Sequence, residues 1–182
     1  MTNRTFLAAR AAAIFSLTVA LHPVPSFAQE IGSLVQPPMA RVRSNHPGLA
    51  AIMAEAARRS ATFRRLVDTI DASDGLVYVD EGTCGHGVKA CLTLGVQVAG
   101  PHRLLRILID PRRKRSGCEL MASIGHELKH AIEVLGEPGV RDFDAAYAFF
   151  ERESPADRTK GRFETQAAVR TGLQVDREAC SG

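Results

Sequence analysis

The chain has 182 residues, of which 24% are charged and 45% hydrophobic, and its formal net charge is +3 at pH 7. This length allows one domain with a sizeable core. The small net charge gives no electrostatic argument for binding nucleic acid. The single basic run, RRKR at 112–115, is expected to be a solvated loop between two elements.

The first 28 residues have the layout of a secretory signal peptide. Two arginines and no acidic residue accompany an apolar stretch at 11–21, and the small residues Ser26 and Ala28 fit a cleavage site. The alternative is an uncleaved membrane anchor, but the apolar stretch is too short to span a bilayer comfortably. Cleavage near Ala28 would remove both positive charges, lower the net charge to +1, and export the chain to the periplasm or the medium without a stable membrane anchor.

The remaining residues predict an α+β fold in one domain, residues 47–182, after an extended lead-in at 29–46. A first helix is expected to begin near Pro47, since the fixed φ of proline suits the first helical position, and Ser60 suits the cap of a second helix. Three short strands rich in Val, Leu and Ile follow, at 76–80, 91–98 and 103–109. Further helices are predicted near 117–135, 142–152 and 162–171. The order of helices, strands and helices predicts a small, mostly antiparallel sheet packed with about five helices.

Four cysteines follow the predicted leader: Cys84, Cys91, Cys118 and Cys180. Export would bring them into an oxidising compartment, and four cysteines allow three pairings. A local Cys84–Cys91 bond would close a hairpin loop, which leaves Cys118–Cys180 to tie the C-terminus to the start of a helix. The alternatives are free buried thiols or a second metal site, and the absence of a CxxC spacing disfavours a zinc site made of cysteines.

The helix predicted at 117–135 has well-marked ends. Ser116 and Glu119 have the spacing of a capping box, and Gly136 followed by Pro138 is typical of a helix end. Apolar residues recur at ~100° per residue and would anchor one face of the helix in the core. These residues are Met121, Ile124, Leu128, Ala131, Ile132 and Leu135.

The opposite face of this helix carries the sequence HELKH at 126–130. Residues four apart lie one turn apart, so His126 and His130 can both bind one cation. Glu127 lies ~100° round the helix from His126, too far to be a natural third ligand, but it can contact a water bound to the metal and take its proton. The alternative is a solvated helix face that contains two histidines by chance.

A zinc site needs a third protein ligand and a fourth position open to water. Glu164, 34 residues after His130 and on the last predicted helix, is the best candidate. The small residues expected beside it are Ala167, Ala168 and Thr171. The alternative is an exposed carboxylate that the helix dipole favours. Glu133 lies on the same helix as the histidines and can hardly reach the same metal. Beyond the leader the other histidines are His46, His86 and His102, and none follows the motif at the spacing H-E-x-x-H-x-x-G-x-x-H.

An H-E-x-x-H helix with a glutamate on a later helix resembles the gluzincin branch of zinc metallopeptidases, over roughly residues 103–172. The resemblance implies a zincin-like fold and one zinc ion bound by His126, His130 and Glu164, with Glu127 as general base and acid. It also implies that the strand at 103–109 lines the cleft and pairs with a substrate peptide, as edge strands can.

The chain departs from this family at two positions. Lys129 stands where the motif residue is usually uncharged, and a lysine near the metal would raise the electrostatic cost of a cation. Ala168 stands where many members carry an acidic partner, so no residue is assigned to orient His126. Tyr147 is the candidate for stabilising the tetrahedral intermediate.

Two functions are compatible with these residues. The first is an exported zinc-dependent peptidase that hydrolyses a peptide or protein substrate with a zinc-bound water and Glu127 as general base. The alternative is a non-catalytic zinc-binding protein, either a degenerate peptidase or a binding module. Lys129 and Ala168 favour the alternative, whereas the intact Glu127 disfavours it, because a pure metal site does not need that glutamate.

Overall fold

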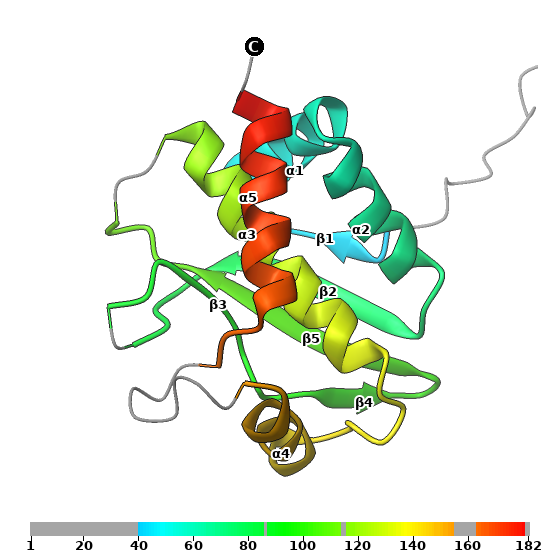
Figure 1. The fold of residues 1–182 in the computed structure, drawn as a ribbon. Helices are drawn as coiled ribbons and strands as arrows, with labels where there is room; N and C mark the ends of the chain where they lie inside the picture. Colours follow the sequence, from blue (N-terminus) through cyan, green and yellow to red (C-terminus); the bar gives the residue numbers. More distant parts are fainter. Residues whose placement is uncertain (1–39, 86, 114–115, 155–162, 181–182) are drawn as a thin grey trace, which may run out of the picture. The chain divides into compact units, whose positions relative to one another are not determined.

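The computed structural model describes residues 40–85, 87–113, 116–154 and 163–180. The predicted signal peptide and most of the predicted lead-in lie outside these residues, as does His86. In the described part the chain forms an α+β fold with five helices and one five-stranded mixed sheet (Figure 1).

The sheet is built around two long parallel strands. Its order is β1 (Val42–Arg43), β2 (Gly75–Glu81), β5 (His102–Ile109) and β3 (Ala90–Leu92), and β4 (Gln97–Ala99) also pairs with β5. Strands β1, β2 and β5 are parallel, whereas β3 and β4 run antiparallel to β5. The expectation of a mostly antiparallel sheet is therefore wrong, because the longest pairing, between β2 and β5, is parallel.

The path of the chain explains this topology. After β2 the chain crosses to the far side of the position that β5 occupies, forms β3 and β4 there, and returns as β5 between them and β2. The strand predicted at 91–98 is thus two short strands, β3 and β4, and β5 is an interior strand. This contradicts the implication that the strand at 103–109 is an edge strand, since β3 holds the edge instead.

One face of the sheet is packed under helices. Alternate residues of the two long strands are almost fully buried, as the period of two in a half-covered strand requires. These residues are Val77, Val79, Leu105, Ile107 and Ile109. Helix α3 (Gly117–Leu135) contacts β2, β3 and β5 as well as the helices α1 (Pro47–Arg59), α2 (Ala61–Asp71) and α5 (Gln166–Cys180). In Figure 1, α5, drawn in red, lies along α3.

The first two helices begin where the sequence predicts. Pro47 is the first residue of α1, and the Ser60 hydroxyl caps α2 by accepting a hydrogen bond from the Phe63 N–H. Helix α4 (Phe143–Glu153) buries only some of its aromatic side chains. Phe150 is buried, but Phe143 and Tyr147 are 55% and 42% exposed, and Ala146 and Phe149 take their places in the core.

The last helix begins later and ends later than predicted. It starts at Gln166 and runs to Cys180, so Glu164 precedes the helix rather than lying on it. Thr165 sets this start, because its hydroxyl accepts a hydrogen bond from the Ala168 N–H at 3.1 Å, as an N-terminal cap does.

Both expected disulfides are present, Cys84–Cys91 and Cys118–Cys180, and no cysteine is free. The second joins the first turn of α3 to the last residue of α5. Two disulfides indicate an oxidising environment. Among the described residues, no helix combines the length and the apolar character needed to span a membrane.

Candidate metal centre

Helix α3 is fixed at its start and along its apolar stripe. Both hydrogen bonds of the predicted capping box are present, from the Glu119 N–H to the Ser116 hydroxyl and from the Ser116 N–H to the Glu119 carboxylate. The predicted stripe is buried except for Ile132, which is partly buried. The histidine face is also largely covered, since His130 is only 4% exposed. The histidines therefore lie within the fold rather than on an open helix face.

The structure brings the three predicted ligands together. Glu164 Oε1 lies 3.2 Å from His126 Nε2 and 3.4 Å from His130 Nε2. Burial alone would raise the pKa of Glu164, but the hydrogen bonds to His126 and His130 outweigh it and lower the pKa to about 2. One carboxylate oxygen thus meets both imidazole nitrogens, although Glu164 precedes α5 instead of lying on it.

Glu127 completes a second, overlapping group. Ligand atoms of His126, Glu127 and His130 lie within 4.8 Å of one another, a group that could hold a metal ion. However, Glu127 Oε1 is 3.9 Å from His126 Nε2, and Oε2 accepts a hydrogen bond from the Leu92 N–H at 2.7 Å. Glu164 Oε1 is closer to His126 Nε2 than Glu127 Oε1 is, and it contacts both histidines. Glu127 stands beside the ligands, held by strand β3.

The Glu127 carboxyl is buried, and its surroundings change its acidity. Burial raises its pKa, although the neighbouring His126 and His130 and the Leu92 N–H act in the opposite direction. A carboxylate with a raised pKa is better suited to take up a proton than a fully solvated one.

Two carboxylates flank the His130 ring. Its Nδ1 lies 3.0 Å from Glu133 Oε2, on the side opposite the contact between Nε2 and Glu164. Burial of the ring alone would lower its pKa, but the hydrogen bonds to Glu133 and Glu164 outweigh burial and raise the pKa to about 9. Glu133 therefore contacts the nitrogen of His130 that does not face Glu164.

Lys129 does not stand unpaired beside the ligands. Its Nζ lies 3.7 Å from Glu133 Oε1, an ion pair between residues four apart on α3. The positive charge that distinguishes this motif is thus partnered by the carboxylate behind His130.

Two pockets meet at the site. The first, of about 380 Å³, is lined by β3, the Cys84–Cys91 loop, Phe150 and Phe163. The second, of about 360 Å³, lies toward Ser123 and Leu173. Both are lined by His126, Glu127 and Glu164. The cleft therefore continues on either side of the candidate ligands and follows β3, the strand at the sheet edge.

Close approach of α3 and α5 makes this meeting possible. A β-carbon built on Gly125 of α3 would lie 2.8 Å from Val175 Cγ2, and one built on Gly172 of α5 would lie 3.1 Å from His126 Cβ. The buried stripe of α5 is made of Ala168, Gly172, Val175 and Ala179.

The other predicted residues lie away from the ligands. His46 pairs with Glu81 at 3.2 Å, and His102 contacts Arg41 at 3.1 Å. Tyr147 stacks on Phe143 and meets the edge of Phe163, and it does not line either pocket at the site. The first pocket has no arginine, lysine or tyrosine among its described lining residues.

Sequence reasoning did not predict the contacts that three residues make at this site. Leu92 holds Glu127 through its backbone, and Thr165 and Glu133 are hydrogen-bonded to each other at 2.9 Å. Of these, only Glu133 had a signal in the sequence, because residues three apart on a helix are neighbours and Glu133 lies three after His130.

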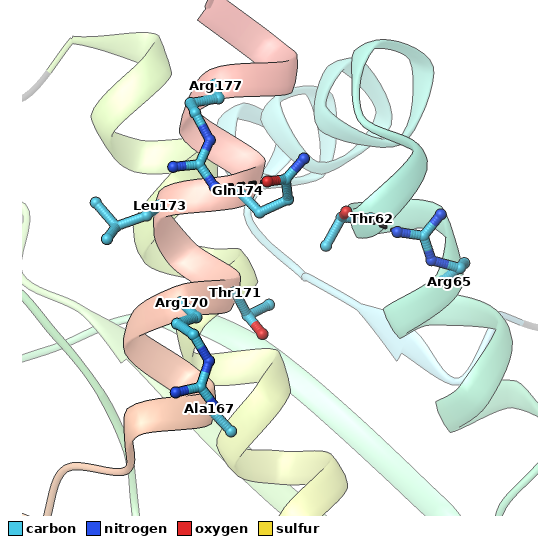
Figure 2. Close-up of a pocket in the computed structure, with 8 residues that line it drawn as sticks. All are labelled: Thr62, Arg65, Ala167, Arg170, Thr171, Leu173, Gln174 and Arg177. Carbon is cyan, nitrogen blue, oxygen red and sulfur yellow. Dashed lines mark hydrogen bonds between the residues drawn. The ribbon is translucent and has the colours of Figure 1, made fainter.

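A larger groove, of about 670 Å³, lies elsewhere, between α2 and α5 (Figure 2). It is lined by arginines, threonines, Gln174 and Leu173, with no histidine, cysteine or carboxylate, so its described lining offers no metal ligands of these kinds. Ala167 and Thr171, which were expected beside Glu164 on the last helix, line this groove.

A comparison of the chain with protein-family models, with curated proteins and with solved structures finds no match.

Proposed function

We propose that this protein is an exported zinc-dependent peptidase with a zincin-like fold. The observation that carries the proposal is the meeting of Glu164 Oε1 with the Nε2 atoms of His126 and His130, at 3.2 and 3.4 Å, next to the buried carboxyl of Glu127.

The donor set fits zinc. Zinc favours tetrahedral sites of imidazole nitrogen and carboxylate oxygen with bonds of about 2.0–2.2 Å, so two ligand atoms should lie about 3.4 Å apart. The distances from Glu164 to the two histidines are close to this value. His126, His130 and Glu164 would hold the ion, which would supply the Lewis acidity that polarises a peptide carbonyl and acidifies water.

Glu127 would move the proton. Its Oε2 is held by the Leu92 N–H, which leaves Oε1, the oxygen nearer His126, to take a proton from the attacking water. The same oxygen would then pass the proton to the leaving nitrogen. The raised pKa that burial gives this carboxyl suits both transfers.

The edge position of β3 supports an extended peptide as substrate. Cys91 pairs with Leu108 of β5, while the N–H of the next residue, Leu92, points away from β5 to Glu127. The Leu92 N–H is already bound to Glu127, but the other backbone groups on this outer edge can pair with an added strand, and the two pockets extend along the edge at the site.

The alternative is a zinc-binding protein without hydrolytic activity. The pockets favour it, since the described lining of the first has no arginine, lysine or tyrosine to stabilise an oxyanion, and that of the second has only Lys89, which pairs with Glu119 at 3.6 Å. The buried Glu127 weighs against it, because burying a carboxyl costs free energy and a metal site made of His126, His130 and Glu164 does not require that carboxyl.

Metal analysis of the purified protein combined with a peptide library tests the proposal. We expect one zinc per chain, loss of zinc in Glu164→Ala, and retention of zinc in Glu127→Gln with cleavage reduced by about 10²-fold or more. A wild type that holds zinc and cleaves nothing would establish the alternative. A wild type that holds no zinc would refute both.

The export component has its own test. Expression of the full chain in a bacterial host should yield a mature protein outside the cytoplasm whose first residue is Gln29, as N-terminal sequencing would report. An intact Met1 on a protein retained in the cytoplasm would contradict it.

A further inference from the structure

Glu133 makes more polar contacts than an exposed charge on a helix surface would make. Its carboxylate lies 3.0 Å from His130 Nδ1, 2.9 and 3.2 Å from the Thr165 hydroxyl and 3.7 Å from Lys129 Nζ. The side chain is only 13% exposed, so these contacts replace most of its hydration.

Thr165 connects this carboxylate to the segment that carries Glu164. The Thr165 hydroxyl donates to Glu133 and at the same time accepts the hydrogen bond from the Ala168 N–H that caps α5. Because Glu164 directly precedes Thr165, the position of its backbone is fixed by the same hydroxyl.

We propose that Glu133 is a positioning residue that holds His130 and Glu164 together as ligands, an inference that rests on the proposed zinc site. It binds His130 by the nitrogen that does not face Glu164, and it anchors Glu164 through Thr165. No other described residue contacts both His130 and Thr165 through hydrogen bonds of its side chain.

The chemistry of imidazole explains the first half of this role. A carboxylate that accepts the proton of Nδ1 fixes the tautomer in which Nε2 carries its lone pair toward the metal, and it also fixes the ring orientation. Lys129 in turn holds Glu133 from the solvent side. Lys129 thus helps to hold Glu133 against His130, and its positive charge is paired with that carboxylate.

Zinc affinity, measured on the full mature protein by competition with a chelator, tests this role. We expect Glu133→Ala to weaken zinc binding by about 10- to 100-fold, and Glu133→Gln to fall between that variant and the wild type because its amide oxygen still accepts a hydrogen bond. Glu137→Gln is the matched control, since it changes an exposed carboxylate close by on the chain. The control should bind zinc like the wild type.

Substitutions at Thr165 test the proposed role of Glu133 independently. Thr165→Val removes the hydroxyl and should weaken zinc binding, whereas Thr165→Ser keeps the hydroxyl and should restore it. In Glu133→Ala, the further change Thr165→Val should cost less than it does alone, because the hydroxyl acts through the carboxylate.

Thermal unfolding of the metal-free variants separates positioning from mere stability. The proposal expects zinc affinity to fall in folded Glu133→Gln protein whose melting temperature without zinc is close to that of the wild type. Wild-type affinity in both Glu133 variants, or in Glu133→Gln if the alanine variant does not fold, would overturn the proposal. A wild type that binds no zinc would instead refute the proposed function.

Discussion

At the scale of single residues, Arg103 is the charge most completely enclosed by the fold. It is 2% exposed and donates to the carbonyl oxygens of Val134, Leu135, Glu137 and Val140 at 2.7–3.1 Å. Two further hydrogen bonds, both of 2.8 Å, join it to Asp74. It therefore adds to the pairing of carbonyl groups at and just beyond the end of α3, where Val134 and Glu137 also accept backbone N–H groups.

We expect Arg103→Met to lower the free energy of unfolding by about 3 kcal/mol, the low end for a broken buried pair because Asp74 can still reach water. Arg106→Met is the matched control on the same strand. Arg106 is 62% exposed and lies 3.7 Å from Asp80, so its loss should cost less than about 1 kcal/mol. Urea unfolding of both variants measures the difference, and equal losses would contradict the prediction.

Glu178 gives the fold a dependence on pH that is separate from the metal centre. Burial raises its pKa, but hydrogen bonds from Gln174, Ser60 and Thr62 outweigh burial and lower the pKa from 4.5 to about 2. Because the folded pKa is the lower one, the stability from the ionised form is complete above about pH 4.5 and is lost as the pH falls toward 2.

The variant Glu178→Gln should therefore be less stable than the wild type at pH 7, and the difference should shrink between pH 5 and pH 2. Urea unfolding with zinc removed by a chelator reports both free energies at each pH. A difference that stays constant across this range would show that ionisation of Glu178 does not stabilise the fold.

At the scale of single residues, the sequence predicted which side chains meet better than it predicted the hydrogen bonds that hold them. The meeting of His126, His130 and Glu164 could be predicted from residue types, because few side chains can serve as zinc ligands. The role of Leu92 could not, since the hydrogen bond to Glu127 comes from its backbone, which any residue would supply.

At the scale of elements, local signals were reliable and long-range ones were not. The cap at Ser60 and the capping box of α3 depend on residues three apart, so the sequence displays them directly. The direction of β2 relative to β5 depends on a crossover between strands that are distant in sequence, which no short pattern reports. The last helix was predicted to end at residue 171, but it continues through Gly172, where the missing side chain permits close approach to His126.

The contact between α3 and α5 is especially close where Gly125 meets the side chain of Val175. An alanine at position 125 would place its β-carbon 2.8 Å from Val175 Cγ2. The overcrowding in Gly125→Ala should destabilise the fold by about 1–3 kcal/mol. The better helix propensity of alanine should offset about 1 kcal/mol of this loss.

Removal of the opposing methyl groups should relieve the crowding. We expect the double variant Gly125→Ala with Val175→Ala to lose less stability than the sum of the two single variants, with a coupling of at least about 0.5 kcal/mol. Urea unfolding of the four proteins completes the cycle. If the losses of stability in the two single variants were additive, the methyl groups of Val175 would not be the source of the crowding.

At the scale of the whole molecule, the two disulfides have different tasks. Cys118–Cys180 closes a loop with a sequence separation of 62 and ties the ends of α3 and α5, whereas Cys84–Cys91 has a separation of only 7. If constraint of the unfolded chain dominates, the first bond stabilises the fold by about 4 kcal/mol and the second by about 2 kcal/mol.

The candidate site lies next to Cys84–Cys91, the disulfide expected to stabilise the fold less. Cys84 and Cys91 line the pocket at the ligands, and Cys91 is followed by Leu92, whose N–H holds Glu127. Replacing both Cys84 and Cys91 by serine should therefore impair peptide cleavage more than replacing Cys118 and Cys180, although it should cost less stability. Parallel measurement of unfolding in urea and of cleavage at a temperature where all proteins are folded tests this opposite ranking. If activity merely followed stability across the two pairs, the short disulfide would have no part in placing Glu127.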